Sequence, residues 1–207
     1  MSLHNFREFF NSFLETIGTC FYPFFGKGLK EDVIADNFAV NSSHDITGKI
    51  LFSQKQLSAY RFGAGSVEHT GCGAVSIYNV LNILQMNPGF AEVISMTERY
   101  AKPILGGRAG ANPFAAGQVL DQYHLDYEMY QFADQMEKAM KNGSVSIVVM
   151  WNTKTNLLKG AHFYAVEKTD QGIRSYNGPG DRRYQSLTDM IGNGKFITGY
   201  TIRKRRV

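Results

Sequence analysis

The chain has 207 residues, of which 43% are hydrophobic and 19% are charged. A chain of this length and composition can bury the core of about one domain, which excludes disorder throughout. The net charge of +4 owes much to the basic run at residues 203–206, which is typical of a solvated tail and not of the basic stripe of a nucleic-acid-binding protein. Two cysteines exclude a disulfide framework and a four-cysteine zinc site, and no apolar run is long enough for a transmembrane helix.

The N-terminal segment is rich in phenylalanine, and its apolar residues recur at helical spacing over residues 3–17. Acidic residues interrupt this pattern, which is atypical of a secretory leader. We expect an amphipathic helix packed on its own domain. The alternatives are a weak membrane-surface contact through residues 3–25, a partner-binding helix or a poor leader. The absence of a clean leader favours a cytoplasmic location.

The next part of the chain contains the clearest helix. Residues 19–60 are rich in turns, with a short strand expected at residues 49–52, and a glycine-rich loop occupies residues 61–71. Apolar side chains then cover most of the circumference of a helix at residues 72–85, so this helix should be buried. Further helices are expected at residues 90–100, 112–123 and 134–141. Between them, the run Gly106–Gly110 is a weak phosphate-loop pattern, which we interpret as a flexible turn.

The periodicity changes at residue 144. An apolar strand is expected at residues 144–151, followed by a hairpin with strands at residues 161–167 and 172–176 and by a last strand at residues 196–203. The expected helices thus precede an expected antiparallel sheet. This order indicates an α+β fold and not a fold of alternating βαβ units.

Cys72 begins the buried helix, and this position has chemical consequences. The unpaired N–H groups and the positive end of the helix dipole stabilise a thiolate, which is the reactive form. The same N–H groups can donate to an oxyanion on a carbonyl that the sulfur attacks. Gly71 and Gly73 would let a substrate approach closely. The alternative is a buried structural cysteine, which is also how we interpret Cys20.

His162 and Asn177 are candidates for the base and its orienting group. With a two-residue loop at residues 170–171, the two residues become diagonal neighbours on one face of the hairpin, about 7–8 Å apart at Cα. The side-chain carbonyl of Asn177 can then accept the Nδ1–H of His162, which leaves Nε2 for the sulfur. The other histidines have less supportive surroundings, and no cluster has metal-ligand spacing.

Three motifs resemble those of papain-like cysteine peptidases. The stretch Thr70–Leu81 resembles their catalytic helix, Gly160–Val166 their histidine strand and Ser175–Pro179 the segment with the third residue. The resemblance covers about residues 60–202 and is closest to the compact branch similar to the bacteriocin-processing, double-glycine leader peptidases. It implies a papain-like α+β fold in residues 59–207, with a central helix that starts at the cysteine, and an N-terminal extension in residues 1–58 packed on the core.

One position departs from the family pattern. These peptidases usually have a glutamine six residues before the cysteine, which completes the oxyanion hole, whereas this chain has Ser66 there. The candidates to replace it are Glu68, His69 and the more distant Gln54 or Gln56.

The resemblance implies a cysteine hydrolase that cleaves a peptide or other amide bond. Cys72 would be the nucleophile, His162 the general base and Asn177 the orienting residue. No metal or cofactor is needed, and the implied partner is a peptide or protein substrate. The alternatives are an acyl transferase with the same residues and a weak or inactive member that only binds peptides.

Overall fold

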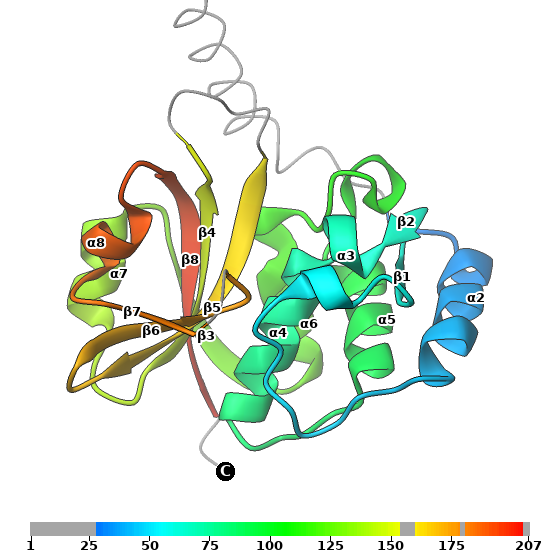
Figure 1. The fold of residues 1–207 in the computed structure, drawn as a ribbon, viewed down its shortest axis with the longest axis horizontal. Coiled ribbons are helices and arrows are strands. Elements are labelled where there is room, and N and C mark those ends of the chain that lie inside the picture. Colours follow the sequence, from blue (N-terminus) through cyan, green and yellow to red (C-terminus); the bar gives the residue numbers. More distant parts are fainter. Residues whose placement is uncertain (1–27, 154–159, 179–180, 205–207) are drawn as a thin grey trace, which may run out of the picture.

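The computed structural model describes residues 28–153, 160–178 and 181–204. The helix expected at residues 3–17, the alternatives for residues 3–25 and Cys20 lie outside these ranges. Figure 1 shows a helical half beside a twisted sheet, which confirms the α+β class. The predicted order of helices before strands holds only in part, because the first strand of the sheet precedes α7, and α8 lies between the last two strands. The helical half contains α2 (Glu31–Ser42), η1 (Gln54–Gln56), α3 (Val67–Thr70), α4 (Cys72–Ile83), α5 (Phe90–Tyr100), η2 (Ile104–Gly107), η3 (Pro113–Ala115) and α6 (Ala116–Gln122), with a small hairpin of β1 (Arg61–Phe62) and β2 (Gly65–Ser66).

The sheet has six antiparallel strands in the order β3-β8-β4-β5-β6-β7. Helices α4 and α6 cover one face of the sheet, and α7 and α8 lie on the opposite face (Figure 1). The elements of this half are β3 (Leu125–Tyr130), α7 (Ala133–Ala139), β4 (Val145–Trp151), β5 (Ala161–Thr169), β6 (Gly172–Tyr176), β7 (Arg182–Tyr184), α8 (Leu187–Ile191) and β8 (Lys195–Lys204).

The β5–β6 hairpin has the predicted register. Thr169 pairs with Gly172 and Ala165 with Tyr176, as a two-residue loop at residues 170–171 requires. This register matters because a slip of one residue would turn every side chain of the second strand to the other face. It therefore determines that the chain after β6 returns beside the start of β5, where His162 lies.

Helix α4 is the centre of the core. Every residue from Cys72 to Leu81 is buried, between α5 on one side and β5 on the other. At Gly73 a Cβ would lie 2.8 Å from the Cβ of Ala111, closer than real Cβ atoms approach. Glycine is thus needed for α4 to pack closely at its N-terminal turn.

The strand expected at residues 49–52 is not present. Instead, the side chain of Asn79 on α4 takes the place of a neighbouring strand: its Oδ1 accepts from the Leu51 N–H and its Nδ2 donates to the Leu51 carbonyl, both at 2.8 Å. The N–H and the carbonyl of Leu51 thus both have a hydrogen-bond partner in a side-chain amide. A neighbouring strand is not required to supply one.

Residues 28–58 pack against the rest of the chain, and Leu57 belongs to the core around α4. Ile34 on α2 is buried, and Asn37 donates to the Gly63 carbonyl at 3.0 Å and to a carboxylate oxygen of Glu98 at 2.6 Å. The boundary between an extension and a main domain at residues 58 and 59 stays a prediction. None of the described helices is long and apolar enough to cross a bilayer.

Candidate functional site

Cys72 is the first residue of α4 and faces a cavity. The short helix α3 ends in a turn in which the Gly71 N–H donates to the Val67 carbonyl at 2.9 Å, and the Gly71 carbonyl then accepts from Val75 at 3.0 Å. This turn starts α4 at Cys72, and the N–H groups of the first helical turn have no intrahelical carbonyl available. Cys72 is 8% exposed and lines a cavity of about 470 Å³, here called the Cys72 cavity.

His162 lies at the second position of β5 and forms a hydrogen bond with the Cys72 thiol. Its Nε2 lies 2.6 Å from the backbone carbonyl oxygen of Asn177. A carbonyl oxygen only accepts, so Nε2 carries a proton and Nδ1 is the ring nitrogen left for the sulfur. This is the reverse of the predicted use of the two nitrogens.

The thiol and the imidazole change each other's proton affinity. Burial alone raises the pKa of Cys72, but the hydrogen bond and positive charge of His162, together with the Phe163 and Gly73 N–H groups, lower it below its ordinary value. Burial alone lowers the pKa of His162, whereas the hydrogen bond and negative charge of Cys72 and the Asn177 carbonyl raise it. Both shifts move the equilibrium toward the thiolate–imidazolium pair.

Tyr164 limits the orientation of the imidazole. The two rings are in an edge-to-face arrangement with centroids 4.6 Å apart. Since β-strand residues two apart share a face, this contact follows directly from the positions of the two residues on β5.

Asn177 joins the two halves of the molecule, but not through the predicted contact. It follows β6 with a left-handed φ of 66°, a conformation that asparagine tolerates better than most residues. Its Nδ2 donates to the backbone carbonyls of Cys72 and Phe163, both at 3.2 Å. The predicted acceptor, its side-chain oxygen, is buried without a hydrogen-bond partner. The orienting contact to His162 is made by the backbone carbonyl because these two donations turn the amide nitrogen toward α4 and β5.

Among the candidates for the missing glutamine, Gln54 alone lines two cavities beside the pair. It lines the Cys72 cavity and also a second cavity of about 510 Å³, which contains Asn177 but not Cys72 and is here called the Asn177 cavity. Its Nε2 donates one hydrogen to the Glu68 carbonyl at 2.8 Å, which leaves a second hydrogen on the same nitrogen. Gln56 is exposed and lines neither cavity.

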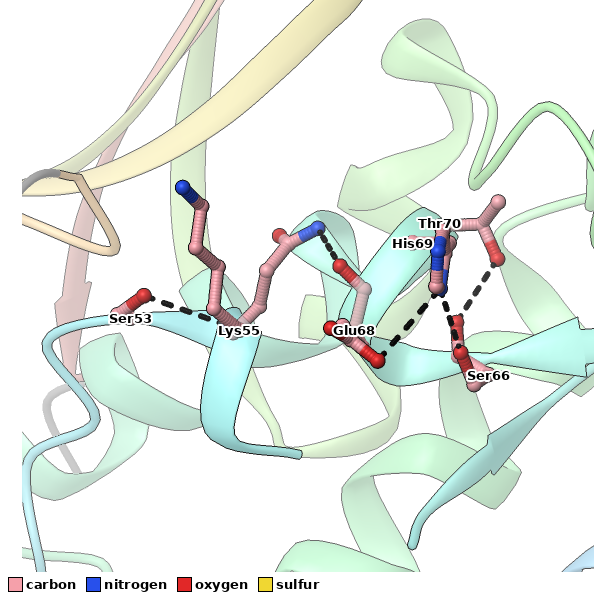
Figure 2. Close-up of polar contacts among 7 residues, drawn as sticks. Ser53, Lys55, Ser66, Glu68, His69 and Thr70 are labelled. Carbon is pink, nitrogen blue, oxygen red and sulfur yellow. Dashed lines mark hydrogen bonds and ion pairs between the residues drawn. The ribbon is translucent and has the colours of Figure 1, made fainter. Parts of the chain in front are cut away.

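Glu68, His69 and Ser66 form a polar cluster of their own. Figure 2 shows the His69 ring between the other two side chains, with Nδ1 3.0 Å from the Ser66 hydroxyl and 3.8 Å from a Glu68 carboxylate oxygen. His69 lines the Cys72 cavity and Glu68 the Asn177 cavity. Gly71 has a packing role as well, since a Cβ there would lie 2.6 Å from a Val67 methyl group.

Sequence reasoning missed several residues of the cavity walls. Trp151 and Asn152, at the end of β4, line the Cys72 cavity together with Arg108 from the glycine-rich run. The change from an apolar strand to a polar residue at Asn152 was a usable signal for a strand end, but not for its position beside Cys72. Among the described residues, no group of three or more His, Cys, Asp or Glu has the arrangement of a metal site.

No family model and no curated protein matches the chain. Two similar solved structures are a double glycine motif protease from an AMS/PCAT transporter in complex with the leader peptide and the peptidase domain of Streptococcus ComA, a bi-functional ABC transporter involved in a quorum sensing pathway. The first is 16% identical, with 65% of this chain and 84% of that chain covered and a TM-score of 0.45. The second is 9% identical, with 65% and 91% covered and a TM-score of 0.45.

The first prediction concerns the pH dependence of Cys72 alkylation by iodoacetamide, measured on the Cys72 peptide by mass spectrometry. The rate should rise with an inflection below the ordinary pKa of a thiol, because the pKa of Cys72 is lowered. In His162→Ala the inflection should move to higher pH, because burial then raises the pKa of Cys72 and no imidazole is present to lower it. The unfolded chain supplies the ordinary thiol as a control. Identical inflections in the two folded proteins would contradict the coupling.

The second prediction concerns Asn177→Asp. A carboxylate cannot donate to the Cys72 and Phe163 carbonyls, so we expect a loss of about 1–3 kcal/mol in the free energy of unfolding near pH 8. Repulsion by these carbonyls and burial raise the pKa of the new carboxyl in the folded state. The loss should therefore be small near pH 4 and grow as the pH rises through the folded-state pKa.

Urea unfolding at several pH values tests this, with Asn177→Gly as the control that keeps the left-handed backbone and lacks a titrating group. The difference from wild type should vary with pH in the Asp variant only. An Asp variant with a pH-independent stability difference would show that Nδ2 does not hold these carbonyls.

Proposed function

We propose that the protein is a cysteine hydrolase that cleaves a peptide or other amide bond, with Cys72 as nucleophile, His162 as general base and acid, and Asn177 as the orienting residue. The observation that carries the proposal is the hydrogen bond between the Cys72 thiol and the His162 imidazole at the wall of an open cavity. A structural cysteine has no need of a charged partner or of a cavity.

In the first half of the reaction, the Cys72 sulfur attacks the amide carbonyl carbon and forms a carbon–sulfur bond. The carbonyl oxygen becomes an oxyanion. His162 then gives its proton to the amide nitrogen, the carbon–nitrogen bond breaks, and an amine leaves. The acyl group remains on Cys72 as a thioester.

In the second half, neutral His162 takes a proton from water while the water oxygen attacks the thioester carbon. The carbon–sulfur bond breaks, the acid leaves, and the thiolate–imidazolium pair is restored. The Asn177 carbonyl serves in both halves, because it holds the Nε2–H and so directs Nδ1 toward the sulfur and the reacting atoms. An amine in the place of water would make the same residues an acyl transferase.

The two cavities give the substrate a direction. The acyl group is bonded to Cys72, so its residues lie in the Cys72 cavity. The leaving amine receives its proton from His162, which also lines the Asn177 cavity, where Cys72 is not a wall. The amine side of the substrate therefore belongs in the Asn177 cavity.

Gln54 is the side chain that we propose for the oxyanion. It lies in the wall of both cavities, where the scissile bond would be, and its second Nε2 hydrogen is directed by the bond that the first makes to Glu68. N–H groups of the first turn of α4 would supply the other donor. Gln54 thus replaces the glutamine that the family has at the position of Ser66.

The third prediction tests hydrolysis itself. The full chain is incubated with a peptide library, and new amino termini are identified. We expect cleavage that falls by at least about 10³-fold in Cys72→Ala and in His162→Ala, and that persists in Cys20→Ala. No cleavage by wild type, together with alkylation of Cys72 at the rate of an ordinary thiol, would favour the alternative of a peptide-binding member without catalysis.

The fourth prediction concerns the oxyanion. Gln54→Ala should lower kcat roughly 10²–10³-fold with little change in KM, because an oxyanion donor acts mainly in the transition state. Gln56→Ala is the matched control, since Gln56 is exposed and lines neither cavity. Equal kinetics for the two variants would remove Gln54 from the mechanism.

A further inference from the structure

The loop at residues 104–111, which includes η2, is a fixed wall of the Cys72 cavity. The Ala64 N–H donates to the Gly106 carbonyl and the Ile104 N–H to the Gly110 carbonyl, both at 2.9 Å. A Cβ on Gly107 would lie 2.8 Å from the Cα of Gly63, so the loop is pressed against the turn of the small β1–β2 hairpin. The flexible turn that the glycine-rich run predicts is thus anchored at several points.

The backbone of this loop does not offer a phosphate site. The Arg108, Ala109 and Gly110 N–H groups all donate to carbonyls of the loop itself. What the loop presents to the Cys72 cavity is therefore the side chain of Arg108, which is exposed at the cavity wall.

The charge of Arg108 is not balanced within the cavity. None of the described residues that line the Cys72 cavity is Asp or Glu. The Cys72–His162 pair is neutral overall in either proton arrangement. His69 is the remaining titratable group of this wall, and the Glu68 carboxylate 3.8 Å away offsets any positive charge on it. The field in the cavity therefore favours an anionic group.

Small residues leave room for such a group beside Arg108. Ala109, Gly110 and Ala111 form the wall next to it, and Gly160 and Ala161 lie on the wall supplied by β5. Arg108 offers a planar fork of donors that suits a carboxylate.

From these observations, and resting on the hydrolase function proposed above, we infer that Arg108 selects substrates with an acidic side chain on the acyl side of the scissile bond. The acyl side follows from the thioester, which confines the acyl residues to the cavity that contains Cys72. The same cation disfavours a basic side chain in this position. Because Arg108 is exposed, the preference is modest and sensitive to salt.

The test uses dipeptidyl chloromethyl ketones, in which the reactive carbon stands beside the scissile carbonyl, so that both residues lie on the acyl side. The reagents carry Glu, Gln or Lys, each paired with Ala in both orders, so that each side chain is tested at either position. Inactivation rates are measured on the full chain as wild type, Arg108→Gln and Arg108→Glu. Arg61→Gln is the matched control, because Arg61 is exposed and lines neither cavity. Neutral iodoacetamide reports the reactivity of Cys72 in every protein.

We expect wild type to react about two- to five-fold faster with the Glu reagent than with the Gln reagent at low salt in at least one order. The preference should disappear in Arg108→Gln, change toward Lys in Arg108→Glu, persist in Arg61→Gln, and vanish in wild type at 1 M salt. Equal Glu and Gln rates in wild type in both orders, or a Glu preference that survives in Arg108→Glu, would overturn the assignment while leaving hydrolysis intact. Slow alkylation of Cys72 by iodoacetamide would instead overturn the proposed function, and the assignment with it.

Discussion

The geometry of the site depends on the hydrogen bonds of one residue, Asn177. Its side-chain nitrogen holds the first carbonyl of α4 and a carbonyl of β5, and its own backbone carbonyl receives the proton of His162. Helical half and sheet are thereby joined at the point where the thiol and the imidazole meet. The left-handed backbone at Asn177 makes this possible, because it lets one residue direct its carbonyl and its amide to different partners.

The same junction explains how a charge pair can exist in a buried place. Burial disfavours both ions, and an isolated thiolate in this position would take up a proton. The imidazole, the two backbone N–H groups and the first turn of α4 act on the sulfur together, while the Asn177 carbonyl acts on the other side of the imidazole. The thiolate and the imidazolium stabilise each other only while both are present. Loss of one partner leaves the other as a costly buried group.

Much of this arrangement could be predicted from local patterns. The apolar run after Cys72 and the two-residue loop after Thr169 determine the central helix and the hairpin register, and these bring positions 72, 162 and 177 together. Whether Asn177 contacts His162 through its side chain or its backbone carbonyl could not be predicted. The outcome depends on which carbonyls of α4 and β5 lie within reach of the side-chain nitrogen.

The missed elements share a similar reason. Helix α2 buries Asn37 and Asn41, whose amides bind the β1–β2 hairpin and α5, so its buried face lacks an apolar pattern. Strand β3 is an edge strand, and only its first and last residues are buried. The expected strand at residues 49–52 was wrong because a side-chain amide of α4 replaces its neighbour. The positions of Gln54 and Arg108 likewise follow from tertiary packing alone.

The separation of the three residues along the chain has a consequence for biosynthesis. Asn177 lies 105 residues after the cysteine whose carbonyl it holds. A ribosome-bound chain that has released only the helical half contains the Cys72 thiol but not His162. The hydrogen bond and charge of His162 that lower the pKa of Cys72 would then act only after the hairpin docks, so the thiol of the emerging chain would lack them until the sheet is complete.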